Sequence, residues 1–248
     1  MDKTLFLTLT ICACVIETVF TPFFLHYQRP GICLKSFICK MICASMFLTV
    51  GILAYVYTGN TSEFAKFLLI GLASSWLGDM FLHMKQGSKV TFGIGMAFFA
   101  AAHVLYLVAY YKATKLYFPE RTFIGILDII LIISTLLIFY YLFKGKGQIN
   151  FLHSIMIVFA IYGLILVTMF VKAVVFGTEY IIAGNSVFGG LCLAFGGTLF
   201  FSSDLTLVLL MFNEKMKKNH RLKDYIIGSY FLGQTLLALS VLSIGLVL

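Results

Sequence analysis

Charged side chains are scarce in this sequence. Asp, Glu, Lys and Arg together make up 11% of the 248 residues, and hydrophobic residues make up 61%, whereas a soluble domain carries roughly a quarter charged residues. With a mean hydropathy of +1.01, the composition excludes a water-soluble globule, a disordered chain and a coiled coil. What remains is an integral membrane protein.

Paired cysteine motifs and a continuous basic patch are also missing. The six cysteines show no C-x-x-C spacing and fall mostly within apolar runs, so we expect them to pack inside helices instead of binding a metal. The 18 basic residues form short clusters between apolar runs, which indicates membrane topology and not nucleic-acid binding. A cleavable signal peptide is not expected, because Glu17 interrupts the first apolar stretch and no small-x-small cleavage site follows it.

Eight apolar runs are long enough to cross a bilayer, whose core of about 30 Å needs about 20 helical residues. They lie at approximately residues 4–24, 36–57, 64–82, 90–111, 123–143, 151–171, 181–212 and 225–248. No run alternates polar and apolar residues as a barrel strand does, and backbone amides cannot stay unpaired in lipid. We therefore predict an all-α, polytopic, single-domain (1–248) membrane protein with eight transmembrane helices and short connections.

Basic residues are unevenly divided between the two sides of such a bundle. One side, with the first, third, fifth and seventh connections, carries Arg29, Lys35, Lys40, Lys85, Lys89, Lys144, Lys146, Lys215, Lys217, Lys218, Arg221 and Lys223. The other side carries Lys3, Lys66, Lys112, Lys115, Arg121 and Lys172. Cytoplasmic connections are enriched in Lys and Arg, so the first side is predicted to be cytoplasmic and both termini to lie outside.

Small residues recur at helical spacing on two runs. They are Gly93, Ala97 and Ala101 on the fourth, and Gly190, Ala194 and Gly197 on the seventh. Such ridges let helices approach closely, so we expect tight packing along both.

Four acidic residues fall inside the predicted spans, where an ionisable group costs roughly 2.5 kcal/mol or more. They are Glu17, Asp79, Asp128 and Asp204. Asp128 follows the start of its span by about one turn, so it is expected to reach the interface. Glu17 is deeper, and we expect it to pair with a basic residue such as Lys35 or Lys40, in a structural or a functional role.

Asp79 and Asp204 stand in similar settings. Each lies in the later half of its span, and the two spans run in the same direction. Both are therefore expected near the cytoplasmic leaflet, where they can share one cavity. Two carboxyl groups in a low-dielectric pocket tend to divide into one protonated acid and one ionised base, which is the arrangement that acid–base hydrolysis needs.

Other polar residues recur near these aspartates at helical spacing. Ser75 and His83 each lie four residues from Asp79, so the three can share one helix face. His103 and Tyr106 are three apart on the fourth span, and Tyr230 and Gln234 are four apart on the last. These pairs either line the same cavity or are core groups with satisfied hydrogen bonds between helices.

Taken in order, several motifs resemble the YhhN-like membrane proteins that include the eukaryotic lysoplasmalogenases. The residues that carry the resemblance are Gly78-Asp79-x-x-Leu82, Gly95 with Phe98 or Phe99, His103-x-x-Tyr106, Tyr162-x6-Met169, Gly197-x-Leu199-Phe200-x-x-Ser203-Asp204, Tyr230-x3-Gln234 and Lys35. Ser36 departs from the pattern, since a proline is expected after the lysine. The family's expected eight spans agree with the eight runs.

This resemblance implies a lysophospholipid substrate, in which the vinyl ether bond of a lysoplasmalogen is hydrolysed to a fatty aldehyde and a glycerophospho-ethanolamine or -choline. Asp79 and Asp204 are the implied acid–base pair. Lys35, His103, Tyr106, Ser203, Tyr230 and Gln234 are the implied substrate-binding or orienting residues, with Lys35 a candidate for the phosphate. Such chemistry requires no metal and no organic cofactor. The implied location is the plasma membrane in a bacterium and the endoplasmic reticulum in a eukaryote.

Three other functions use the same residues. A proton- or ion-coupled transporter would relay ions through Glu17, Asp79 and Asp204. An intramembrane aspartyl protease would need a Gly-x-Gly-Asp motif, but Trp76 occupies the first glycine position. A lipid-binding scaffold would bind the lipid without turnover.

Overall fold

Eight helices make up the computed structural model of this chain, which describes residues 2–29, 31–59, 61–84, 88–143, 153–212 and 219–245. The helices are α1 (Lys3–Gln28), α2 (Leu34–Tyr57), α3 (Glu63–Met84), α4 (Lys89–Tyr117), α5 (Ile126–Phe143), α6 (His153–Ile182), α7 (Val187–Phe212) and α9 (His220–Ile244). No strand occurs among the described residues. Seven of these helices are long and apolar enough to cross a membrane, and α5 is a shorter apolar helix. The predicted all-α, polytopic membrane fold is confirmed.

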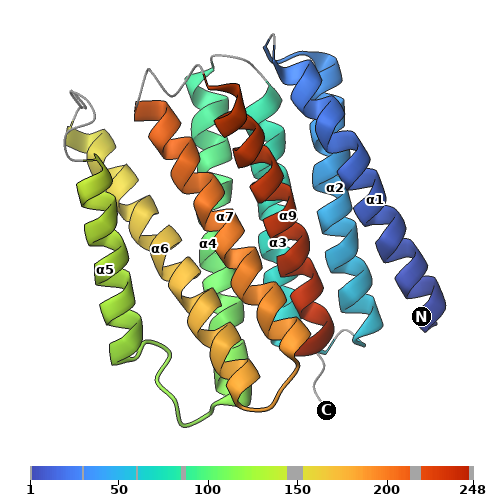
Figure 1. Ribbon diagram of the computed structural model, residues 1–248, viewed down its shortest axis with the longest axis vertical. Helices are drawn as coiled ribbons and strands as arrows, with labels where there is room; N and C mark the ends of the chain where they lie inside the picture. Colours follow the sequence, from blue (N-terminus) through green and yellow to red (C-terminus); the bar gives the residue numbers. More distant parts are fainter. Residues whose placement is uncertain are drawn as a thin grey trace.

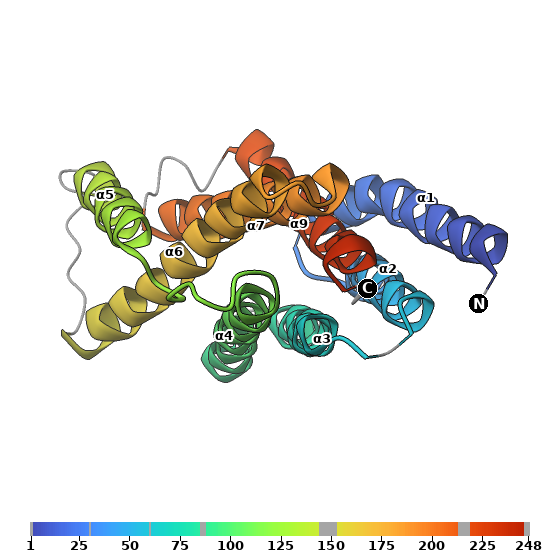
Figure 2. The ribbon, with the colours of Figure 1, turned by 90° about the horizontal axis from the view of Figure 1, so that it is seen from below.

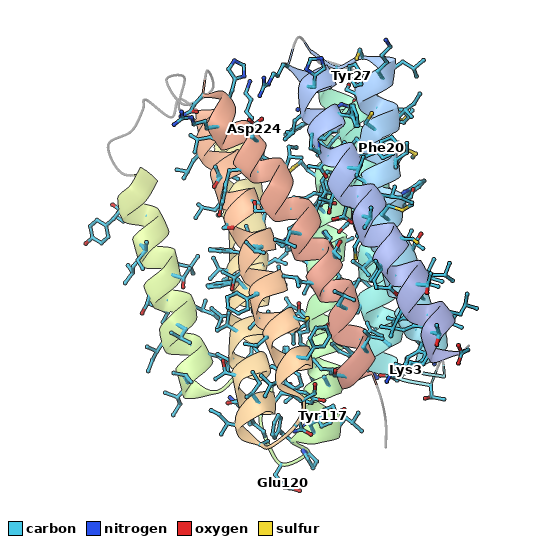
Figure 3. All side chains as sticks on the ribbon, turned by 45° about the vertical axis from the view of Figure 1, so that its right-hand side comes forward. Lys3, Phe20, Tyr27, Tyr117, Glu120 and Asp224 are labelled. Atoms are coloured by element: carbon cyan, nitrogen blue, oxygen red, sulfur yellow. The ribbon has the colours of Figure 1, made fainter. Side chains whose placement is uncertain are left out.

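Consecutive helices alternate in direction, and both termini lie at the same end of the bundle (Figure 1). We call the end that carries Tyr27 and Asp224 the upper end, and the end that carries Lys3 and Glu120 the lower end (Figure 3). The helix α9 packs against α1, α2, α3 and α7, and in the view along the bundle it lies among them, whereas α5 lies at the periphery beside α6 (Figure 2). The last helix of the chain is therefore central to the fold.

The sixth helix ends later than predicted, and the seventh begins later than predicted. The span predicted at 151–171 corresponds to α6, which continues to Ile182, and the span predicted at 181–212 corresponds to α7, which begins at Val187. The polar Lys172 marked the predicted end, but this side chain is buried inside the bundle. The helix instead ends before Gly184, whose φ of 82° is a left-handed conformation that suits glycine after a helix.

The other helix boundaries follow local capping groups. The last helix starts earlier than the predicted residue 225, because the side chain of Asn219 accepts hydrogen bonds from the amides of Arg221 and Leu222. The start of α5 lies after the predicted residue 123, and there Asp128 accepts a hydrogen bond from the Gly125 amide at 2.8 Å. The predicted ends at residues 151 and 248 lie outside the described residues.

Two buried lysines change the charge count that predicted the topology. Lys40 and Lys172 both lie inside the bundle, so neither belongs to a membrane surface. Each had been counted on a different side, so the excess of Lys and Arg on the first side remains. Lys85, Lys144, Lys146, Lys215, Lys217 and Lys218 lie outside the described residues. Which side faces the cytoplasm stays a prediction.

Close contacts between glycines hold α7 against its two neighbours. A Cβ at Gly190 of α7 would lie 2.6 Å from the carbonyl oxygen of Gly177 of α6, and a Cβ at Gly177 would lie 2.7 Å from that of Gly190. The predicted ridge on α7 therefore packs tightly against α6. On the opposite side, a Cβ at Gly233 of α9 would lie 2.9 Å from the Phe200 amide nitrogen, and one at Gly196 would lie 2.9 Å from that of Leu237. These crossings fix the position of α7.

The small-residue ridge predicted on α4 is not a packing surface. Gly93, Ala97 and Ala101 are all exposed, and a Cβ at Gly93 would meet nothing within 4 Å. The contact with α3 is made from the opposite face, where a Cβ at Gly95 would lie 2.7 Å from Leu82. Sequence spacing identified a ridge of small residues but could not show which face of the helix is buried.

Candidate functional site

Asp79, five residues before the end of α3, is almost completely buried, with 1% of its surface exposed. Its Oδ1 atom lies 3.0 Å from the ammonium nitrogen of Lys40, which is buried in α2. Its Oδ2 atom accepts a hydrogen bond of 2.6 Å from the hydroxyl of Tyr230 on α9. Both oxygens of this carboxyl group are thus engaged by donors, one of them a cation.

Asp204, on α7, is also buried but has different neighbours. Its Oδ2 atom accepts a hydrogen bond of 2.6 Å from the hydroxyl of Tyr162 on α6. The same oxygen lies 3.6 Å from Nε2 of His103 on α4. No Lys or Arg among the described residues forms an ion pair with Asp204.

The neighbours of His103 indicate which of its two nitrogens carries the hydrogen and which presents a lone pair to Asp204. Nδ1 lies 2.6 Å from the carbonyl oxygen of Phe99. A carbonyl oxygen can only accept, so Nδ1 carries the hydrogen and, in the neutral ring, Nε2 is left as an acceptor. Nε2 is buried and has no hydrogen-bond partner among the described residues. A protonated Asp204 is the group best suited to face this nitrogen.

A chain of aromatic contacts connects the two carboxyl groups. The ring of Tyr230, which donates to Asp79, lies 5.6 Å from the ring of Phe200. Phe200 in turn stacks on His103 at 4.6 Å, and His103 faces Asp204. Through these contacts the two carboxyl groups belong to one buried cluster.

A second polar group lies one helical turn below this cluster. The hydroxyl of Tyr106 donates to Oε1 of Gln234 at 2.7 Å, and Nε2 of Gln234 donates to Oγ of Ser75 at 3.1 Å. Ser75 precedes Asp79 by four residues, and Gln234 follows Tyr230 by four. Tyr106 and Gln234 thus join α3, α4 and α9 directly under the carboxyl group of Asp79 without touching it.

Three residues that the sequence grouped with the aspartates lie elsewhere. Lys35 is exposed at the start of α2, with its ammonium 5.6 Å from the centre of the Tyr27 ring. The hydroxyl of Ser203 donates to the carbonyl of Ile226 at 2.9 Å and so links α7 to α9. Nε2 of His83 lies within hydrogen-bonding distance of the hydroxyl of Ser36, at 3.2 Å, and neither described oxygen contact of Asp79 is with His83.

Two residues of the cluster were not selected as candidates from the sequence. Lys40 carries a signal that could have found it, because a lysine at the seventh position of an apolar helix requires a buried partner. It was counted as a surface cation because it lies near the predicted start of its span. Tyr162 belonged to a motif of the resemblance, but nothing in its spacing pointed to Asp204.

The other two buried acids are Glu17, whose predicted partners are wrong, and Asp128, for which the sequence predicted no partner. Glu17 pairs with neither Lys35 nor Lys40. The ammonium of Lys40 faces Asp79 instead, and both carboxyl oxygens of Glu17 accept from the hydroxyl of Thr235, at 3.0 and 2.8 Å. Asp128 lies in the first turn of α5, as the sequence indicated, but its side chain is not exposed. It is fully buried, and its Oδ1 lies 3.1 Å from the ammonium of Lys172.

No group of three or more His, Cys, Asp or Glu side chains in the described part of the chain is arranged to hold a metal ion. The six cysteines are all free thiols. The buried cluster itself brings together two carboxyl groups, a lysine, an imidazole and two phenols.

Similarity to known proteins covers most of the chain. A family model described as the YhhN family matches residues 39–241, a range that includes every residue of the buried cluster. No curated protein matches the chain, and no solved structure matches it.

Proposed function

This chain belongs to the YhhN family, and we propose on that premise that it hydrolyses the vinyl ether bond of lysoplasmalogens within the membrane. The products are a fatty aldehyde and a glycerophospho-ethanolamine or -choline. Asp79 and Asp204 are the proposed catalytic pair.

The contrast between the surroundings of the two carboxyl groups is the observation that carries this proposal. Lys40 and Tyr230 both donate toward Asp79, which favours its ionised form. Asp204 likewise accepts a hydrogen bond from a tyrosine. It differs from Asp79 because it has no lysine or arginine among its described ion-pair partners and faces a nitrogen lone pair, and this difference favours its protonated form. This contrast supports Asp204 as the acid and Asp79 as the base, an order that the sequence left open.

Vinyl ether hydrolysis needs one acid and one base in turn. In the first step the carboxylic acid of Asp204 gives its proton to the β-carbon of the double bond, which leaves an oxocarbenium ion and the Asp204 carboxylate. Water then adds to the oxocarbenium carbon and loses a proton to the Asp79 carboxylate, so that a hemiacetal forms. Negative charge fixed nearby stabilises the cation in between.

Collapse of the hemiacetal restores both residues. The protonated Asp79 gives its proton to the glycerol oxygen as the carbon–oxygen bond breaks. The hemiacetal hydroxyl loses its proton to Asp204, and the aldehyde is released. The surrounding groups orient this pair: Tyr162 and His103 hold Asp204, and Lys40 and Tyr230 hold Asp79.

Aldehyde release by the purified protein in detergent micelles, with lysoplasmenyl-ethanolamine as substrate, tests the proposal. We expect Asp79→Asn and Asp204→Asn each to lower kcat by about 10²–10⁴-fold, the usual contribution of a general acid or base. The double variant should be little slower than the slower single variant, because the two residues act as a unit. Glu63→Gln, which alters an exposed carboxyl group of α3, is the matched control.

Two results would contradict this assignment. Nearly full activity in either single variant would remove that residue from the mechanism. A rate that stays constant from about pH 4 to 9 would exclude a pair of ionising carboxyl groups, because an acid and a base in series give two ionisations in the pH–rate profile.

An ion-coupled carrier is the second candidate, and Glu17 is the observation that favours it. This buried carboxyl group accepts hydrogen bonds only from Thr235 among the described side chains, and no described cation pairs with it, so it could take up and release an ion. The two functions separate in one comparison. A hydrolase releases aldehyde in detergent, whereas a carrier acts only across a sealed membrane with a gradient.

A further inference from the structure

A cavity of about 390 Å³ opens at the upper end of the bundle between α1, α7 and α9. Apolar side chains of the three helices, among them Leu25, Leu207 and Ile226, form much of its wall. Its polar groups are those of Gln28, Arg29, His220, Lys223 and Asp224. Asp224 lies where α9 begins, beside the end of α1 (Figure 3). The cavity is therefore amphipathic and lies at the predicted membrane surface.

Two residues of the cavity wall lie close to the proposed catalytic cluster along their helices. Leu207 follows Asp204 by three residues, which is about 4.5 Å along the axis of α7, and Ile226 precedes Tyr230 by four, which is about 6 Å along that of α9. The hydrogen bond from Ser203 to the carbonyl of Ile226 keeps these two walls together. A lipid whose phosphate occupies the cavity would thus have its glycerol backbone directed toward the two carboxyl groups.

Charges of both signs line the mouth of the cavity. The guanidinium of Arg29 lies 3.5 Å from the carboxylate of Asp224, and both side chains are partly exposed, so this pair contributes little stability and can exchange partners. Lys223 adds a second cation. Arg29 and Lys223 suit a phosphate, and Asp224 suits an ammonium group. A ligand that carries phosphate alone would meet the negative charge of Asp224.

An unpaired acceptor distinguishes between the two common ammonium headgroups. Oε1 of Gln28 is buried and has no hydrogen-bond partner among the described residues, so it is an acceptor that a hydrogen-bond donor of a ligand would satisfy. Ethanolamine has three N–H groups, whereas choline has none and is usually bound by aromatic rings. No Phe, Tyr or Trp is among the described residues that line the cavity.

We propose that this cavity is the headgroup site of the enzyme, and that it selects phosphoethanolamine over phosphocholine lysolipids. Arg29 and Lys223 bind the phosphate, and Asp224 and Gln28 bind the primary ammonium. The identity of the lipid rests on the proposed function, but the headgroup selection rests on the cavity.

Binding of saturated 1-O-alkyl lysolipids tests this proposal without turnover, because these lipids contain no vinyl ether bond. We expect the ethanolamine lipid to bind the purified protein about tenfold more tightly than its choline counterpart, and Gln28→Leu to reduce this preference to about twofold or less. Lys223→Ala should weaken both lipids about equally. Arg221→Ala removes an exposed cation of the same helix that does not line the cavity, and should change neither affinity.

Three outcomes would overturn the headgroup site. They are equal binding of both lipids, an unchanged preference in Gln28→Leu, and competition by inorganic phosphate as effective as that by the ethanolamine lipid. Selective binding by a protein that releases no aldehyde would instead overturn the proposed function and leave the headgroup site in place. Size-exclusion profiles of the variants establish that they remain folded.

Discussion

At the scale of single residues, the two aspartates have the same side chain but different partners. The sequence could identify both, because each is an ionisable group at a depth where such groups are costly. It could not assign their roles, because these depend on Lys40 from α2 and His103 from α4, which only the packing of four helices brings to them. Long-range partners of this kind leave no spacing signal.

Replacement of Lys40 tests whether its charge keeps Asp79 ionised. In Lys40→Met the carboxylate of Asp79 would be buried without its cation, so we expect it to take up a proton and to lose its function as a base. Activity in the aldehyde assay should fall about 10²-fold or more, and Lys40→Arg should restore part of it. Lys66→Met, which removes an exposed lysine of α3, should retain full activity. A fully active Lys40→Met would show that Asp79 needs no cation.

At the scale of helices, the number and type of elements follow from hydrophobic length alone, whereas several ends do not. Lys172 was interpreted as the end of a span because the sequence could not show that Asp128, from the preceding helix, lies 3.1 Å away. A charge that is neutralised inside the bundle looks in the sequence like a charge at the surface. The two ridges of small residues are alike in the sequence but differ in the structure, because the sequence does not show which face of a helix packs against a neighbour.

The crossing of α7 and α9 should be the helix contact most sensitive to added volume. In Gly233→Ala the new Cβ would lie within about 3 Å of the Phe200 amide, so the helices must separate, and Asp204 must move relative to Tyr230. We expect a loss of stability of about 1–3 kcal/mol and reduced aldehyde release. Thermal unfolding in detergent measures the first effect.

Gly228→Ala is the matched control on the same helix. A Cβ at Gly228 meets nothing within 4 Å, so the substitution should be neutral or should stabilise the helix by about 0.5–1 kcal/mol. If Gly233→Ala and Gly228→Ala unfolded at the same temperature, the close approach of α7 and α9 would not limit stability.

At the scale of the whole molecule, the arrangement of the helices places both termini at one end of the bundle. Which end faces the cytoplasm is predicted only from the asymmetry of the Lys and Arg residues. Cys33 offers a direct test. This exposed thiol precedes α2 at the upper end, and the other five cysteines lie within helices. Hydrogen bonds from Ser36 lower the pKa of Cys33, so its reactive thiolate persists at lower pH than that of an ordinary cysteine.

Labelling with a membrane-impermeant maleimide should therefore report the orientation. If the upper end is cytoplasmic, Cys33 of intact cells should be labelled only after the membrane is permeabilised. A cysteine introduced at the lower end, Glu120→Cys in a Cys33→Ser background, should be labelled without permeabilisation. The reverse pattern would invert the predicted topology. Ser36→Ala should shift the labelling rate of Cys33 toward higher pH, because it removes one of the hydrogen bonds that stabilise the thiolate.

The central position of α9 has a consequence for how the protein is made. Ribosomes synthesise this helix after the other seven described helices, yet it supplies Tyr230 to Asp79 and Thr235 to Glu17. Until it inserts, the earlier helices hold two acidic groups inside the membrane without these hydrogen bonds, and polar groups left unsatisfied there are costly. A nascent chain that ends before α9 should therefore be recognised as incomplete and degraded, and the buried cluster would form only in chains that include α9.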